Sequence, residues 1–152
     1  MTFAILFLLS CSIFSSGCAL GPANINPCLL ITPAEARAVL RAPVGGEGPQ
    51  EWGNGVVVCH YIAPADQNLR IEVHPGGAKA YELYVKAFEN TPQGSPQTVR
   101  GLGDQAVFQA GQLVVQWQEH FFVLSIGLAI DDAERLRVSK ALARQVLSRI
   151  TR

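Results

Sequence analysis

Three short segments near the end of the chain are rich in β-branched and aromatic residues, and turns of two to three residues separate them. The segments span residues 106–109, 113–117 and 121–126. Strands joined by turns this short must pair antiparallel, because a parallel crossover needs a dozen or more residues. The pattern therefore predicts an antiparallel meander.

Two further strands are expected earlier, over residues 56–62 and 69–73, with a turn between them. Apolar and polar residues alternate in the second of these strands, so successive side chains point to opposite faces of a sheet. We expect the apolar set to face the core and the polar set to face solvent or a neighbouring element. The apolar set is Leu69, Ile71 and Val73, and the polar set is Arg70, Glu72 and His74.

Three helices are expected from their caps and their period. Thr32 can cap a helix that begins with a capping box and ends near Arg41. Residues 77–90 repeat apolar side chains with the period of a helix, and a last helix begins at Asp131 or Asp132. Amphipathic helices need a sheet face to cover. The chain is therefore predicted to form an α+β two-layer sandwich, an antiparallel sheet of about five to six strands covered by about three helices, with a closed barrel as the alternative.

The segment from Pro43 to Gly55 is rich in glycine and proline, which predicts a long irregular loop. This loop carries Trp52, one of two tryptophans in the chain. A large amphipathic ring on a loop is typical of binding hot spots, so we expect Trp52 to anchor a partner. The alternative is that Trp52 folds onto the core beside Val56, since tryptophan is usually well buried.

The N-terminus reads as an export signal. Residues 3–14 form an almost unbroken apolar run that is too short to span a membrane, and small residues follow it up to Cys18. No basic side chain precedes Arg37, which is atypical of such signals. The expected organisation is a signal peptide over residues 1–17, a tether over 18–27 and a single α+β domain over 28–152.

The sequence Ser15-Ser16-Gly17-Cys18 resembles the lipobox of bacterial lipoproteins, in which the cysteine is acylated and becomes the new N-terminus. Ser15 stands where those proteins usually have leucine, so ordinary signal-peptidase cleavage near Ala19 remains an alternative. The resemblance implies an exported protein on the periplasmic or extracellular face, anchored to a membrane by lipid. Ala19 would direct it to the outer membrane if the cell has one.

The four cysteines divide by position. Cys11 is removed with the signal and Cys18 is the lipidation candidate, which leaves Cys28 and Cys59 as an even pair. In an oxidising compartment these two are expected to form a disulfide. There is no CxxC motif for redox chemistry, and two thiols are too few for a typical structural zinc site.

Charge and motifs narrow the classes of function. All 12 basic and 12 acidic residues follow Cys18, so the mature chain is formally neutral and nucleic acid is not an expected partner. The histidines match no metal-binding spacing, and no GxSxG nucleophile motif is present. We expect no cofactor and no metal site. The alternative is an envelope enzyme, hydrolase-like, whose site combines Glu72 and His74 with the nearby Tyr61.

Four features of the mature chain occur together in a known group. They are Cys28 before the Thr-Pro-Ala-Glu-Ala helix start, Cys59 in the first strand, the Val-Arg-Gly-Leu-Gly-Asp-Gln-Ala segment at 99–106, and the closing Ala-Leu-Ala-Arg helix. The chain thus resembles small uncharacterised exported lipoproteins of actinobacteria, which are similar to extracytoplasmic sensor domains. The resemblance implies an envelope location, a structural disulfide, and a module that binds a small molecule or a protein.

Overall fold

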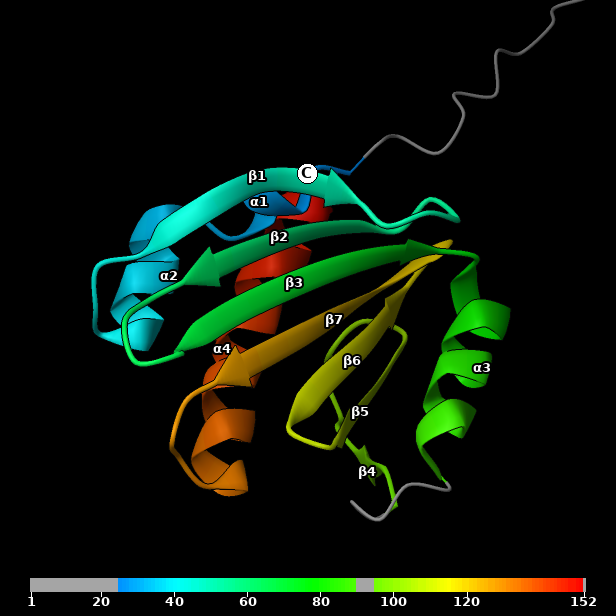
Figure 1. The fold of residues 1–152 in the computed structure, drawn as a ribbon. Coiled ribbons are helices and arrows are strands. Elements are labelled where there is room, and N and C mark those ends of the chain that lie inside the picture. The colour runs from blue at the N-terminus through cyan, green and yellow to red at the C-terminus, as the bar shows by residue number, and fades with distance from the viewer. Residues whose placement is uncertain (1–24, 90–94, 152) are drawn as a thin grey trace, which may run out of the picture.

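The computed structural model describes residues 25–89 and 95–151 of the chain. The predicted signal peptide, Cys18 and most of the predicted tether lie outside these residues. Among the described residues, seven strands form a single sheet in the order β1-β2-β3-β7-β6-β5-β4, and every neighbouring pair is antiparallel (Figure 1). The strands are β1 Gly45–Glu51, β2 Val57–Ile62, β3 Asn68–Pro75, β4 Gln97–Thr98, β5 Gln105–Gln109, β6 Gln112–Trp117 and β7 His120–Gly127.

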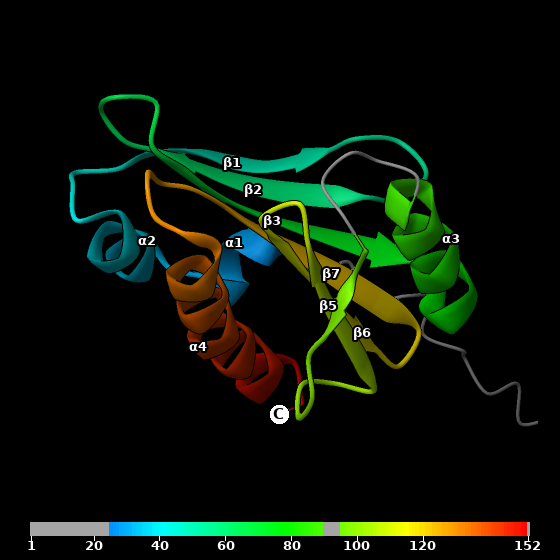
Figure 2. The ribbon, with the colours of Figure 1, turned by 90° about the horizontal axis from the view of Figure 1, so that it is seen from below.

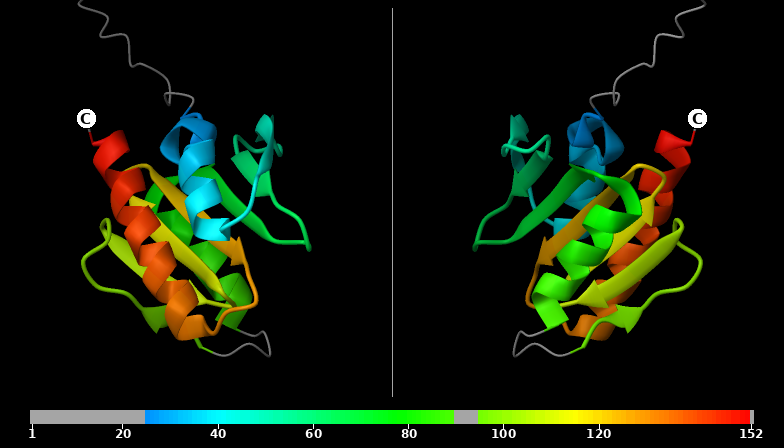
Figure 3. Two further views of the ribbon diagram at one scale, coloured as in Figure 1. Left: turned by 90° about the vertical axis from the view of Figure 1, so that its left-hand side faces the viewer. Right: turned by 90° about the vertical axis from the view of Figure 1, so that its right-hand side faces the viewer.

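The four helices of the described residues lie on both faces of this sheet. They are α1 Pro27–Leu30, α2 Pro33–Leu40, α3 Gly77–Glu89 and α4 Asp132–Ile150. The first face carries α1, α2 and α4, and α1 lies beside the C-terminal end of α4 (Figures 2 and 3). The second face carries α3, which packs on β6 and β7. The predicted α+β sandwich is confirmed, with α3 as a partial further layer, and the sheet is open instead of closing into a barrel.

The core lies between the first face and its three helices. Alternate residues of the central strands supply it, for example Leu69 and Ile71 of β3 and Leu124 of β7, all completely buried. The intervening residues of β6 and β7, Val114 and Val123, form a smaller cluster with α3 on the second face. The central strands are therefore apolar on both faces where a helix covers each.

The predicted helix start and disulfide are both present. The Glu35 amide donates to Thr32 Oγ1 at 3.3 Å, and the Thr32 amide donates to Glu35 Oε2 at 2.8 Å, which completes the capping box. Cys28 and Cys59 form a disulfide that joins α1 to β2. The bond fastens the first helix of the domain to the sheet.

The prediction that residues 43–55 form an irregular loop is wrong. Gly45–Glu51 form β1, which pairs with β2 at the edge of the sheet and contains an irregularity between Glu47 and Gln50. An edge strand bonds on one side only, so it tolerates Pro49, which lacks an amide hydrogen. Gly46 lies opposite Tyr61, and a Cβ there would make only an ordinary contact with the Tyr61 ring at 3.4 Å, so the pairing does not require glycine at this position.

Candidate functional site

The second face of the sheet is covered unevenly. Helix α3 packs on β6 and β7 and reaches His74 of β3 through Tyr84, whose ring lies 5.4 Å from the imidazole. No described helix packs on the second face of β1 and β2. Two large apolar residues, Trp52 and Ile62, are exposed beside this part of the sheet. We call the second face of β1 and β2, together with Arg70 of β3, the open face.

Trp52 follows β1 at the start of the turn to β2. Its backbone amide donates to the Val56 carbonyl at 2.8 Å, and Gly53, Asn54 and Gly55 all have positive φ, so the turn is tight. The Trp52 side chain is 52 % exposed. The guanidinium of Arg70 lies over its ring, 5.5 Å from the centroid. The alternative in which Trp52 folds onto the core is therefore wrong, and a cation–π contact holds the ring on the open face.

Arg70, Glu72 and His74 share one face of β3, as their alternation predicts. Glu72 is only 5 % exposed, and its two carboxylate oxygens pair with Arg70 Nε at 2.8 Å and with His74 Nε2 at 2.9 Å. A buried carboxylate is costly unless charged or polar partners compensate it. Arg70 is thus held in position below Trp52 by a buried anion.

The predicted trio of Glu72, His74 and Tyr61 is only partly assembled. Neighbouring residues of a strand point to opposite faces, so Tyr61 points to the first face while His60 points to the second. On the first face the Tyr61 hydroxyl donates to the Ile31 carbonyl. Tyr84 of α3 supplies the phenol near His74 instead. The helical stripe in the sequence indicates that Tyr84 packs on the sheet, but it does not indicate which strand it meets.

His74 is enclosed by aromatic rings. Its imidazole stacks on Phe121 at 4.4 Å between centroids, and Tyr84 meets it edge-on. Burial, followed by the charge of Glu72, raises the pKa of Tyr84 to about 12. The Tyr84 hydroxyl donates to Gln112 Oε1 at 3.4 Å. A phenol with this pKa stays protonated at neutral pH, so this cluster favours packing over nucleophilic chemistry.

A row of polar side chains crosses the second face. The strand register places His60 beside Arg70, Arg70 beside Ser125, Ser125 beside Gln112 and Gln112 beside Gln109. Among the described residues, Ser125 Oγ and both amide atoms of Gln109 are buried without a hydrogen-bond partner. We call these five residues the polar row. Sequence reasoning missed it, because its members come from five strands.

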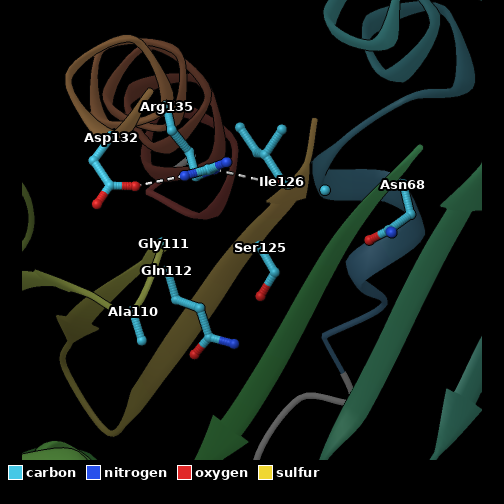
Figure 4. Close-up of a pocket in the computed structure, with 9 residues that line it drawn as sticks. Asn68, Ala110, Gly111, Gln112, Ser125, Ile126, Asp132 and Arg135 are labelled. Atoms are coloured by element: carbon cyan, nitrogen blue, oxygen red, sulfur yellow. Dashed lines mark hydrogen bonds and ion pairs between the residues drawn. The ribbon is translucent and has the colours of Figure 1, made fainter. Parts of the chain in front are cut away.

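A hollow of about 570 Å³ lies beside two inner members of the polar row, Ser125 and Gln112 (Figure 4). Gln112 and Ser125 line it together with Asn68 of β3 and Asp132 and Arg135 of α4. The volume is that of an ordinary small-molecule site. Its lining is mainly polar, which suits a ligand that offers hydrogen bonds.

Arg135 in the wall of this hollow is largely committed to the fold. Its Nε donates to the Ile126 carbonyl at 3.1 Å, and Nη2 donates to the carbonyls of Leu128 and Ile130 at 2.9 and 3.0 Å. Its Nη1 pairs with Asp132 at 2.5 Å. The guanidinium therefore closes the connection between β7 and α4, and its charge is already compensated.

A second hollow, of about 790 Å³, lies between the C-terminal end of α2 and the N-terminal half of α4. Its lining is mostly aliphatic, with residues such as Val39, Leu128 and Val138. Glu134 and Arg137 at its rim pair with each other at 2.7 Å. This hollow lies on the helix side of the molecule, away from Trp52 and the polar row.

In the described part of the chain, no group of three or more histidine, cysteine or acidic side chains is placed to hold a metal ion. None of the described helices has the length and apolar character to cross a membrane. Comparison with protein-family models, with curated proteins and with solved structures finds no match to this chain.

Proposed function

We propose that this protein is a lipid-anchored binding module of the cell envelope, and that it engages a small molecule or a protein through the open face. The observation that carries the proposal is Trp52. Its ring is more than half exposed, yet Arg70 holds it in place. Exposed aromatic residues that are positioned before binding lose little conformational entropy on binding, which favours affinity.

Export and lipid anchoring enter this proposal from the sequence. The lipobox-like segment at Cys18 supports the anchor. The disulfide between Cys28 and Cys59 gives indirect support for export, because disulfides persist in oxidising compartments. The balanced charge of the mature chain argues against nucleic acid as the partner.

An enzyme is the second candidate, because Glu72 and His74 form an acid–base pair at 2.9 Å. The imidazole is packed between Phe121 and Tyr84, however, and offers little space for a substrate. Binding therefore explains the exposed groups better than catalysis does.

Photocrosslinking in intact cells tests the proposed surface. A photoreactive amino acid is placed at position 52 and, as the matched control, at position 83, where Leu83 of α3 is 62 % exposed. We expect a crosslinked adduct from position 52 that is absent from position 83. Equal yields from both positions, or no adduct from position 52, would contradict the proposal.

A further inference from the structure

We propose that Trp52 and the polar row form one continuous site for a neutral, polyhydroxylated ligand, a glycan. This inference rests on the proposed binding function and names the class of its ligand. Three observations carry it: the continuity of the site, the chemistry of its groups and the balance of its charges.

The continuity follows from the strand register. Trp52 stacks with Arg70, Arg70 lies directly beside Ser125 on the neighbouring strand, and Ser125 lies beside Gln112. Ser125 and Gln112 line the polar hollow. The site therefore runs from β1 to β6 over five adjacent strands, a length of about 20 Å at the usual strand spacing. This length suits an oligomeric ligand better than a single small molecule.

The chemistry of the groups matches a sugar. An indole ring offers a wide apolar face, against which the C–H face of a sugar ring can pack. The polar row offers the Gln112 amide, the Ser125 hydroxyl, the Arg70 guanidinium and the His60 imidazole, which together donate and accept hydrogen bonds as hydroxyl groups require. Among the described residues, the buried Ser125 Oγ has no hydrogen-bond partner. A buried hydroxyl without a partner is costly, and a ligand hydroxyl in the hollow would supply one.

The charges favour a neutral ligand over an anion. Arg70 is paired with Glu72 at 2.8 Å, and Arg135 is paired with Asp132 at 2.5 Å. Each described cation beside the site therefore has its own carboxylate. A phosphate or carboxylate ligand would have to compete with these carboxylates, whereas a neutral ligand would not.

The sheet edges argue against a peptide that binds by adding a strand. One edge is β4, which has only two residues, and the other is β1, which contains Pro49 and an irregularity in its pairing. Short strands, proline and bulges at an edge are the devices by which natural sheets avoid further pairing. Binding across the face is thus favoured over binding along the edge.

Titration calorimetry with the full-length protein in mild detergent tests the inference. The probes are chitotetraose, cellotetraose, maltotetraose and mannotetraose at up to millimolar concentration, with inorganic phosphate as the anionic probe. We expect at least one tetrasaccharide to bind and phosphate to give no signal. Absence of binding by all four sugars, or binding of phosphate alone, would overturn the inference.

Two variants locate the binding. Trp52→Ala should weaken the sugar by about tenfold or more, and the matched control Leu83→Ala, another exposed apolar residue, should change its affinity less than about twofold. Ser125→Ala should weaken the sugar while the melting temperature stays equal or rises, because the unbound protein loses an unpartnered hydroxyl. Sugar binding that survives Trp52→Ala unchanged would overturn the inference.

Fluorescence gives an independent readout. In the Trp117→Phe variant only Trp52 emits, and its emission should lie to the red, be quenched by iodide and shift to the blue as sugar binds. Emission that does not respond to a sugar bound in the calorimeter would place that sugar elsewhere and contradict the site. The crosslinking experiment is separate: a discrete protein adduct from position 52 without sugar binding would retain the proposed function and reject the glycan.

Discussion

Arg149 joins three segments of the chain through one guanidinium. Its two terminal nitrogens donate to the carboxylate oxygens of Glu35 at 2.8 and 2.6 Å, and Nη1 also donates to the Leu30 carbonyl. The hydrogen bonds from Arg149, together with those from Thr32, lower the pKa of Glu35 to about 2. The end of α4 is thereby fastened to the start of α2 and to α1.

The lowered pKa of Glu35 predicts that the stability of the folded protein depends on pH in the acid range. The carboxyl group of Glu35 binds protons more weakly in the folded protein than in the unfolded one, so its contribution is complete above the unfolded value of 4.5 and is lost as pH falls toward 2. Glu35→Gln should lower the free energy of unfolding by about 1–2 kcal/mol at neutral pH. Urea denaturation of both proteins over this pH range measures the difference.

The two unfolding curves should converge at the acid end of that range. Glu134→Gln is the matched control, because Glu134 pairs with Arg137 on an exposed part of α4 and such pairs contribute little. A difference between wild type and Glu35→Gln that is the same at neutral pH and near pH 2 would contradict the assignment.

At the scale of elements, the turn over residues 101–104 fits closely against β6. The Asp104 amide donates to the Gln116 carbonyl at 2.9 Å, and the Asp104 carboxylate accepts from the Gln118 amide at 2.8 Å. The Asp104 carboxylate thus caps the turn between β6 and β7. The Gly-Leu-Gly-Asp segment is therefore a structural turn that is hydrogen-bonded to the end of β6 and to the turn after it.

Alanine substitutions at Gly101 and Gly103 should separate the cost of backbone strain in this turn from the cost of a steric clash with β6. Both have positive φ, but a Cβ on Gly103 would lie 2.2 Å from the Gln116 carbonyl oxygen, and one on Gly101 would meet nothing within 4 Å. Gly101→Ala should cost about 1 kcal/mol from strain alone. Gly103→Ala should cost about 3 kcal/mol or more, because strand β6 has to move. Thermal denaturation checks this order, and equal costs would contradict it.

The disulfide between α1 and β2 is a second prediction at this scale. The two cysteines are 31 residues apart, and closing a loop of this length contributes about 3–4 kcal/mol in the chain-entropy description. The Cys28→Ser, Cys59→Ser double variant should lose about that much stability in urea denaturation. Thiol titration of the unfolded, unreduced protein without its signal should find neither cysteine free, and two free thiols would refute the bond.

At the scale of the whole molecule, the open prediction concerns the N-terminus. If Cys18 carries lipid, mass spectrometry of the mature protein should find an acylated Cys18 as the first residue. Several acyl chains on one cysteine anchor a protein stably in a membrane. The Cys18→Ser variant should then be released from the membrane fraction. An unmodified chain that begins at Leu20 would refute lipidation and leave export intact.

The amino-acid sequence by itself determined the local structure of this protein. The β-branched runs and short turns specified the antiparallel hairpins, the capping box at Thr32 specified where α2 begins, and the even pair of cysteines in the domain specified the disulfide. These features depend on residues close together in the chain, or on a choice between few partners. Their physical causes can therefore be read along the sequence.

The tertiary structure decided which of these parts lie together. The pairing of β3 with β7 joins residues about fifty positions apart, and no local pattern encodes that register. This pairing places Arg70 beside Ser125 and builds the polar row, while β1 becomes a strand only because β2 offers it an edge. Trp52 was identified from the sequence, but Arg70 beneath it and the hollow beyond it depend on long-range register, which packing of the whole sheet sets.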